Sequence, residues 1–225
     1  MGRCGSVVLM LALVLTLSSC ATNLRTGAVG GAAAGAVIGG TASGSARDAI
    51  IGAVIGGAAG AVIGGAAGAV IGGVMDAQAE DLQDKLPNAR VERIGEGIGV
   101  TFDSGILFDV GQSTLRTAAP QNLRELAESL EDYEGTSVLV FGHTDSTGDV
   151  ELNQSLSERR ADAARTFLLG AGLDNDRVSA VGRGEQDPVD TNETEAGRQA
   201  NRRVLIAIYA SEDMQAEMMR RHGGL

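Results

Sequence analysis

Aromatic residues, cysteine and proline are scarce in this sequence of 225 residues. Aromatics make up 3%, Trp is absent, and there are three prolines and two cysteines. Since large aromatic side chains dominate core burial, only part of the chain can build a dense core. Basic residues are also few: the formal net charge of −11 argues against nucleic acid as a partner. Glycine is abundant, with 33 residues, and is concentrated in one segment.

The first 19 residues have the pattern of a secretory signal peptide. Arg3 supplies a positive start, and the apolar run SVVLMLALVLTL follows. This run is too short for a stable membrane span. It ends in LSSC, which resembles the bacterial lipobox, where the chain is cut before a cysteine that becomes lipidated. We therefore expect residues 1–19 to be removed and residues 20–26 to form a lipidated N-terminus with an acyl group such as palmitate on Cys20. A conventional cleavage site with an incidental cysteine is the alternative.

The residue after this cysteine implies a destination. Residue 21 is Ala, whereas Asp marks inner-membrane retention in enterobacteria-like sorting. By that resemblance the lipid enters the outer membrane, and the chain faces the periplasm. Cys4 lies within the signal peptide, so Cys20 is the only cysteine of the mature chain. This excludes a disulfide within one mature chain and a cysteine metal site.

Residues 27–75 repeat glycine at a spacing of four. The hexapeptide GAVIGG begins at Gly35, Gly52, Gly60 and Gly68. Each glycine costs a helix about 1 kcal/mol relative to Ala, so such a row favours helices whose backbones approach closely. The segment resembles the glycine-zipper families. Because TASGSARD interrupts the repeat with turn residues, we expect a glycine-zipper helical hairpin.

The location of this hairpin stays open. Residues 49–75 carry no charge and would extend about 40 Å as a helix. The first arm, residues 27–40, would extend only about 21 Å, against a hydrocarbon core of about 30 Å. Insertion of a hairpin, partial insertion, self-association, a compact periplasmic hairpin and a Gly/Ala tether are all compatible with the pattern.

The polar stretch DAQAEDLQDKL and the following Pro87 predict a helical extension and then a break. We therefore expect residues 76–96 to be a linker that leads to a globular domain at 97–210. In the tail, residues 211–225, three methionines (Met214, Met218 and Met219) would share one side of a short helix. That side would pack on the domain or bind a partner.

The domain alternates short strands with helices. GVTF, GILF, TSVLVFGH, DRVSAVGRG and RVLIAIYA read as strands. Residues 120–133 and 149–170 read as helices, and residues 195–202 read as a short helix or a turn. This order predicts a two-layer α/β sandwich, β-α-β-α-β-(α)-β, after the helical hairpin.

The helix expected at 149–170 carries two polar residues in its apolar stripe. Arg160 and Asn153 lie roughly 80° and 100° around the helix from Leu152, among alanines, leucines and a phenylalanine. An arginine there must extend to solvent, form an ion pair or bind a ligand. Asp145 lies in the loop just before the helix, so helix geometry leaves two alternatives: an Asp145–Arg160 ion pair or a ligand site.

Several motifs in order, ILFDVGQSTL, GHTDSTG…NQSLSERRA and VGRGEQDPV…GR..NRRV, resemble the OmpA-like peptidoglycan-binding domain from about Ile98 to Ala210. The resemblance implies that Asp145 and Arg160 hold meso-diaminopimelate of the cell-wall peptide. A zwitterion needs an acceptor for its ammonium group and a bidentate donor for its carboxylate. It also implies that Asn153 and Arg202 line the site. Gly111 replaces a polar residue of many members, which leaves backbone contact there.

These patterns predict an outer-membrane lipoprotein that binds peptidoglycan, with neither cofactor nor metal. An enzyme would use His143 and Asp145, but no nucleophile motif accompanies them. A motor-stator role needs an ionisable residue within the span, and none lies between Asp48 and Asp76. The remaining alternative is a membrane-active or assembly protein that works through its glycine zipper and uses wall binding as an anchor.

Replacing the lipidated cysteine tests the expected anchor. Cys20→Ser should leave an unlipidated, full-length precursor, because the cleavage that precedes Cys20 depends on its modification. Acyl labelling and gel mobility measure both effects. Normal processing together with normal labelling would contradict the lipoprotein prediction.

Overall fold

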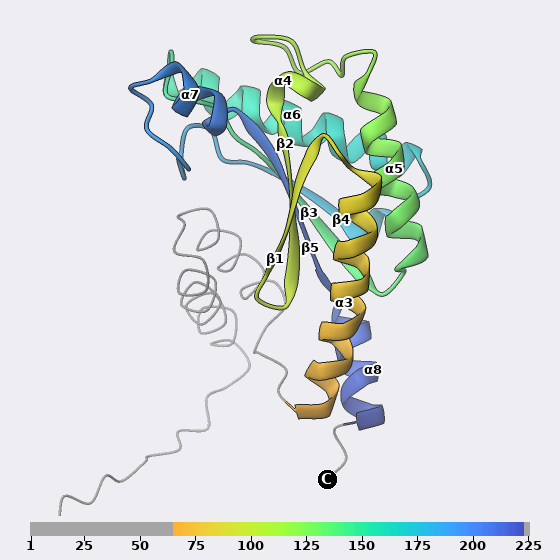
Figure 1. Ribbon diagram of the computed structural model, residues 1–225. Helices are drawn as coiled ribbons and strands as arrows, with labels where there is room; N and C mark the ends of the chain where they lie inside the picture. Colours follow the sequence, from red (N-terminus) through yellow and green to blue (C-terminus); the bar gives the residue numbers. More distant parts are fainter. Residues whose placement is uncertain (1–64, 223–225) are drawn as a thin grey trace, which may run out of the picture.

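A computed structural model describes residues 65–222 (Figure 1). Signal peptide, Cys20 and most of the glycine repeat lie outside the described residues, so the hairpin prediction is not addressed. The helices are α3 (Gly65–Lys85), α4 (Ser104–Leu107), α5 (Ala119–Asp132), α6 (Val150–Gly170), η1 (Asn175–Arg177), α7 (Glu195–Asn201) and α8 (Glu212–His222). The strands are β1 (Ala89–Ile94), β2 (Gly97–Asp103), β3 (Thr136–Gly142), β4 (Val178–Gly182) and β5 (Arg203–Ala210).

The five strands form one mixed sheet in the order β1-β2-β5-β3-β4. Only β3 and β4 are parallel, and α6 makes the crossover that a parallel pair requires. The central strand β5 pairs with β2 and β3, so that Ile206 lies opposite Val100 on one side and Val140 on the other. The two-layer α/β prediction is confirmed.

Helices α3, α5 and α6 cover one side of the sheet (Figure 1). The apolar face of α5 is the one predicted, since Leu123, Leu126 and Leu130 are fully buried. They pack with the inward side chains of the strands, such as Val140 and Ile206, in the main core. This packing fixes α6 against the sheet and therefore fixes the loop that precedes α6.

The strand predicted at GILF is wrong. These residues lie largely in α4, which begins because the Asp103 carboxylate accepts the Gly105 amide at 2.9 Å. Phe108 follows the helix and forms only an isolated bridge with Leu115. A short apolar run fits either a strand or a buried helical turn, and here the N-terminal cap decides.

The linker expected at residues 76–96 is also wrong. Helix α3 runs through the expected boundary at residue 75, and β1 pairs with β2 along its whole length. Met75, Leu82 and Leu86 are at most 1% exposed and belong to the main core. This segment is therefore part of the folded domain.

The C-terminal helix α8 packs beside α3 (Figure 1). Met214 and Met218 contact the main core, whereas Met219 is 48% exposed. Of the two alternatives for the tail, packing on the domain is the one observed. None of the helices between residues 65 and 222 has the length and apolar character needed to cross a membrane.

Truncation of a buried α3 side chain distinguishes a packed helix from a linker. We expect Leu82→Ala to lower the free energy of unfolding by about 2–5 kcal/mol, because it leaves a cavity in the core. Urea unfolding measures the change. The control is Glu80→Ala on the exposed side of the same helix, and equal stability of the two variants would contradict the packing of α3.

Candidate functional site

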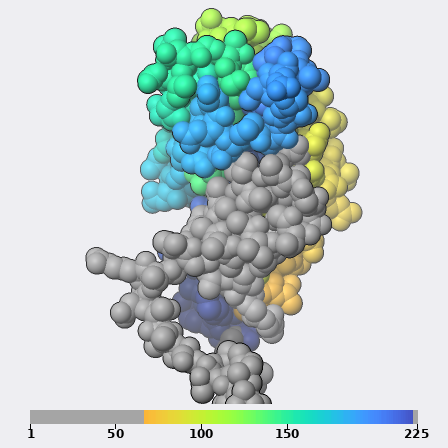
Figure 2. Space-filling view, turned by 90° about the vertical axis from the view of Figure 1, so that its left-hand side faces the viewer, coloured from red at the N-terminus to blue at the C-terminus, as the bar shows by residue number. Residues whose placement is uncertain are grey.

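Three segments meet around a cavity of about 560 Å³ at the upper end of the molecule (Figure 2). They are the loop between α4 and α5, the loop from β3 together with the first half of α6 that follows it, and helix α7 with the residue after it. A volume of this size suits a small ligand or a side-chain group of a polymer. All five residues predicted for the binding site line it: Gly111, Asp145, Asn153, Arg160 and Arg202.

The loop from β3 into α6 is held rigidly. A Cβ on Gly142 would lie 2.1 Å from the Ser157 carbonyl oxygen, so glycine permits α6 to pass directly over the end of β3. The Thr144 amide donates to the Gly184 carbonyl at 2.8 Å. Asp149 then caps α6 by accepting two amides of its first turn. The residues between these points are consequently fixed in front of the helix.

Asp145 forms an ion pair with Arg202, not with Arg160. Its Oδ2 lies 2.5 Å from Nη1 of Arg202, and its Oδ1 accepts the Thr147 amide at 2.8 Å. Of the two alternatives that helix geometry left open, the internal Asp145–Arg160 ion pair is therefore wrong. Burial alone would raise the pKa of Asp145, but the hydrogen bonds from Arg202 and Thr147 lower it below its ordinary value. The carboxylate is thus ionised at neutral pH.

Arg202 is bound by three acceptors. Besides Asp145, its guanidinium donates to Glu195 at 2.6 Å and to Gln199 at 2.5 Å, both in α7. Burial opposes the charge, yet the bonds to Glu195 and Asp145 raise the pKa of Arg202. Arg202 therefore joins α7 to the loop before α6.

Arg160 is the buried cation of the cavity. Its side chain lies within the apolar stripe of α6, as the helix geometry predicts, and the residue is 4% exposed. Nε donates to the Gln112 carbonyl at 2.9 Å, and the guanidinium carbon lies 5.4 Å from the ring centre of Phe108. Among residues 65–222 no carboxylate lies within ion-pair distance of it. Burial, followed by the charge of Arg202, lowers the pKa of Arg160, which still remains a cation at neutral pH.

Asn153 supports the loop before α6. Its Nδ2 donates to the carbonyls of Asp145 and Thr147 at 3.3 and 3.2 Å and to Glu185 at 2.9 Å. Its amide nitrogen is therefore fully engaged, and only the side-chain oxygen remains for a ligand. Gly111 has φ +69°, which suits glycine, and a Cβ there would meet nothing within 4 Å.

Sequence reasoning did not identify the other residues of the cavity, which are Val110, Thr144, Thr147, Leu156, Glu195 and Arg198. Thr144 is 5% exposed, and its hydroxyl has no hydrogen-bond partner in the described part of the chain. Glu195 and Arg198 belong to a seven-residue helix with no clear apolar period, so no sequence signal marked them. The charges around the cavity are three arginines and two carboxylates.

His143 does not line this cavity. It is 1% exposed, and Nδ1 lies 3.4 Å from the Gln186 carbonyl, to which it donates. Burial, with the nearby charge of Arg203, lowers the pKa of His143 from 6.5 to about 3. The side chain is therefore a neutral structural group. Within residues 65–222 no group of three or more His, Cys, Asp and Glu side chains is placed to hold a metal ion.

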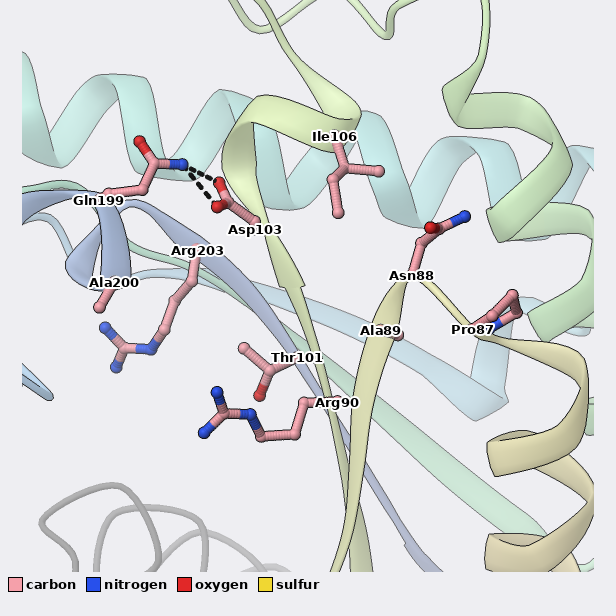
Figure 3. A pocket seen from close by; sticks show the side chains of 10 residues that line it. All are labelled: Pro87, Asn88, Ala89, Arg90, Thr101, Asp103, Ile106, Gln199, Ala200 and Arg203. Atoms are coloured by element: carbon pink, nitrogen blue, oxygen red, sulfur yellow. Dashed lines mark hydrogen bonds between the residues drawn. The ribbon is translucent and has the colours of Figure 1, made fainter. Parts of the chain in front are cut away.

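A second cavity of about 420 Å³ lies near the start of β1 (Figure 3). Its acidic group, Asp103, accepts two contacts from Gln199, one of them at 2.5 Å. Arg203, the second arginine of NRRV and the first residue of β5, lines this cavity, whereas Arg202 at the end of α7 lines the cavity around Arg160. None of the five predicted site residues lies here, so the cavity around Arg160 is the better candidate.

Comparisons with known proteins agree with the fold and the motifs. The OmpA family model matches residues 107–202, which include all five predicted residues of the cavity, and a YMGG-like Gly-zipper model matches residues 1–65. The probable lipoprotein YiaD of Escherichia coli (strain K12) is 37% identical over 136 residues, which are 60% of this chain and 62% of YiaD. The match thus spans about three fifths of that relative.

Solved structures give the same result. The cell wall anchor of the T6SS from Pseudomonas aeruginosa is 30% identical, with a TM-score of 0.53, and the match covers 61% of this chain and 97% of that one. A putative MotB like protein from Desulfovibrio vulgaris shares the fold at 21% identity and a TM-score of 0.59, over 64% of this chain and 95% of that one. Residues 107–202 thus resemble the OmpA family in sequence, and the described domain shares the fold of these solved structures.

The buried neutral histidine makes stability depend on pH. In the unfolded chain His143 takes up a proton below about pH 6.5, whereas in the folded domain it does so only near pH 3. The stabilisation of the folded state by neutral His143 is therefore present above about pH 6.5 and decreases as the pH falls toward 3. Between pH 7 and pH 5 we expect a loss of about 2 kcal/mol in the free energy of unfolding. Urea unfolding of His143→Gln should show a smaller loss over this interval, and an equal loss would contradict the assignment.

Proposed function

We propose that this chain is an outer-membrane lipoprotein, anchored through Cys20, whose C-terminal domain binds peptidoglycan non-covalently and so tethers the envelope. The part of peptidoglycan that the domain binds is the diaminopimelate of the stem peptide. The observation that carries the proposal is Arg160, a buried arginine that lines the cavity without a carboxylate partner in residues 65–222. A desolvated cation of this kind is stabilised when an anionic ligand binds.

The chemistry of the cavity suits a zwitterionic ligand. The guanidinium of Arg160 donates to the Gln112 carbonyl and, at 3.5 Å, to the Asp109 carbonyl, and it lies over Phe108, which leaves its other N–H groups for a ligand carboxylate. The ammonium group of the same ligand would share Asp145 with Arg202. Asp145 is ionised, because the bonds from Arg202 and Thr147 lower its pKa. The hydroxyl of Thr144 and the side-chain oxygen of Asn153 are available for further hydrogen bonds.

The relatives support both halves of the proposal. YiaD is described as a probable lipoprotein, and the Pseudomonas aeruginosa structure is described as a cell wall anchor. The sequence adds the lipobox pattern that ends at Cys20. Catalysis is not part of the proposal, because His143, the residue on which an enzyme would depend, is buried outside the cavity.

Truncation of either charged group should weaken binding to cell walls. Asp145→Ala or Arg160→Ala leaves one ligand charge unpaired in a partly desolvated cavity, which costs about 2–5 kcal/mol. We expect the affinity of the purified protein for diaminopimelate-type sacculi to fall at least ~30-fold. Co-sedimentation with sacculi measures the affinity.

The matched control is Arg159→Ala, one residue away. Arg159 is exposed and donates to the Ser155 hydroxyl at 2.6 Å, so its loss should change binding little. Circular dichroism must show that each variant is folded. Folded Asp145→Ala and Arg160→Ala proteins that bind like the wild type would refute the site.

A further inference from the structure

Exposed apolar side chains gather at the mouth of the cavity around Arg160. Among residues 65–222, six large hydrophobic side chains are exposed, and three of them, Val110, Val150 and Leu152, come from the loop before α5 and the first turn of α6. Val110 is 96% exposed and Leu152 is 70% exposed, and neither belongs to the main core. Since packing within the domain does not account for these side chains, a contact with a ligand is the alternative.

One row of side chains on α6 connects this surface to the buried cation. Leu152, Leu156 and Arg160 follow each other at a spacing of four residues, so they lie one turn apart on the same face of the helix. Their exposure decreases in that order, from 70% at Leu152, through half-buried Leu156, to 4% at Arg160. The row therefore leads from the surface to the cation along about 12 Å of helix.

Val110 reaches the same cavity from the loop between α4 and α5. It lies between Asp109 and Gln112, whose carbonyls accept the guanidinium of Arg160 at 3.5 and 2.9 Å. Val110 and Leu156 both line the cavity. We call Val110, Leu152 and Leu156 the apolar rim.

We infer that the apolar rim binds the alanine that adjoins diaminopimelate in the stem peptide, so that the site recognises two residues of the peptide and not diaminopimelate alone. The inference rests on the proposed function, because the free end of diaminopimelate must first bind Arg160 and Asp145. A binding residue for the neighbouring alanine is an addition to that function.

The length of the ligand agrees with the length of the row. Three methylene groups separate the free end of diaminopimelate from its α-carbon in the peptide, a distance of about 5 Å, and the next α-carbon lies about 3.8 Å beyond. Helical side chains lean toward the start of their helix, so the guanidinium of Arg160 lies closer to Leu152 than its own α-carbon does. A ligand that binds Arg160 through its free end and extends along this row therefore places its next residue near Leu152.

The charges beside the apolar rim favour alanine over the other neighbour of diaminopimelate, which is a glutamate. The side chain of Asp109, next to Val110, is 72% exposed. Asp149 is exposed too, and it accepts two amides of the first turn of α6, so these donors are not free for an anion. Two carboxylates at this place would repel the carboxylate of glutamate, whereas the methyl group of alanine gains from contact with apolar side chains.

Two synthetic probes that differ by one methyl group test the inference. Each is meso-diaminopimelate with an acetylated amine at its L-centre, and the carboxyl group of that centre carries either D-alanine amide or glycine amide. Isothermal titration calorimetry with the mature Cys20→Ser chain measures both dissociation constants. The variants are Val110→Ser and Leu152→Gln, which remove apolar surface at exposed positions. The control is Met219→Ser, because Met219 is 48% exposed on α8, at the far end of the domain (Figure 1).

We expect the wild type to bind the alanine probe about fourfold more tightly than the glycine probe, because one more methyl group leaves water. In Val110→Ser and Leu152→Gln this ratio should fall to about one, while the dissociation constant of the glycine probe stays within about twofold of the wild-type value. Met219→Ser should keep the wild-type ratio.

A wild-type ratio of one, or an unchanged ratio in both rim variants, would overturn the inference. The proposed function would survive this result if Arg160→Ala binds neither probe, whereas a wild type that binds neither probe would overturn both. Sedimentation velocity tests the other candidate occupant, a second copy of the chain. Self-association that Leu152→Gln abolishes would show that the apolar rim is an interface between chains and would likewise overturn the inference.

Discussion

The ion pair between Asp145 and Arg202 determines the geometry of the cavity. It joins the loop after β3 to the residue after α7, and these lie 57 residues apart in the sequence. Without it, a carboxylate that is 7% exposed would be buried without its charged partner, and α7 would lose its contact with the loop before α6. The pair also determines whether Arg160 has a carboxylate partner. Because Arg202 satisfies Asp145, the buried charge of Arg160 stays unmatched by any carboxylate of residues 65–222. Both carboxylates of the cavity, Asp145 and Glu195, are thus paired with Arg202 or Arg198, and Arg160 is the cation whose charge a ligand would balance.

The predictions that rested on periodicity were the most accurate. A repeat of 3.6 residues places Arg160 within the apolar stripe of α6, and the structure confirms that Arg160 is buried, whereas Arg159, which the same repeat places at the edge of the stripe, is exposed. The partner of Asp145 could not be obtained in this way, because contacts between distant segments depend on how loops close in space. The five residues that the motif resemblance named line one cavity, but the resemblance did not show that two of them pair with each other.

The errors concern segments whose composition misleads. DAQAEDLQDK is polar on average, yet Met75, Ala79, Leu82 and Leu86 recur at spacings of three and four and are buried. The average polarity of the segment therefore did not indicate a helix that packs on the core. β1 was missed for a related reason: in ARVERI, one side faces α3 and the other lies on the opposite side of the sheet, and charged residues occur on both. In GILF, four apolar residues were too few to separate a strand from the helical turn that the Asp103 cap begins.

The position of α3 bears on how a tether of this kind would carry load. The N-terminal end of α3 and the cavity around Arg160 lie at opposite ends of the domain (Figure 1). A pull between a lipid on Cys20 and a ligand on Arg160 would therefore pass through α3, the sheet and α6. A free linker at residues 76–96 would have transmitted that pull directly to β2. The packed helix instead spreads it over the core contacts of Met75, Leu82 and Leu86, which must be lost together before α3 can leave the sheet.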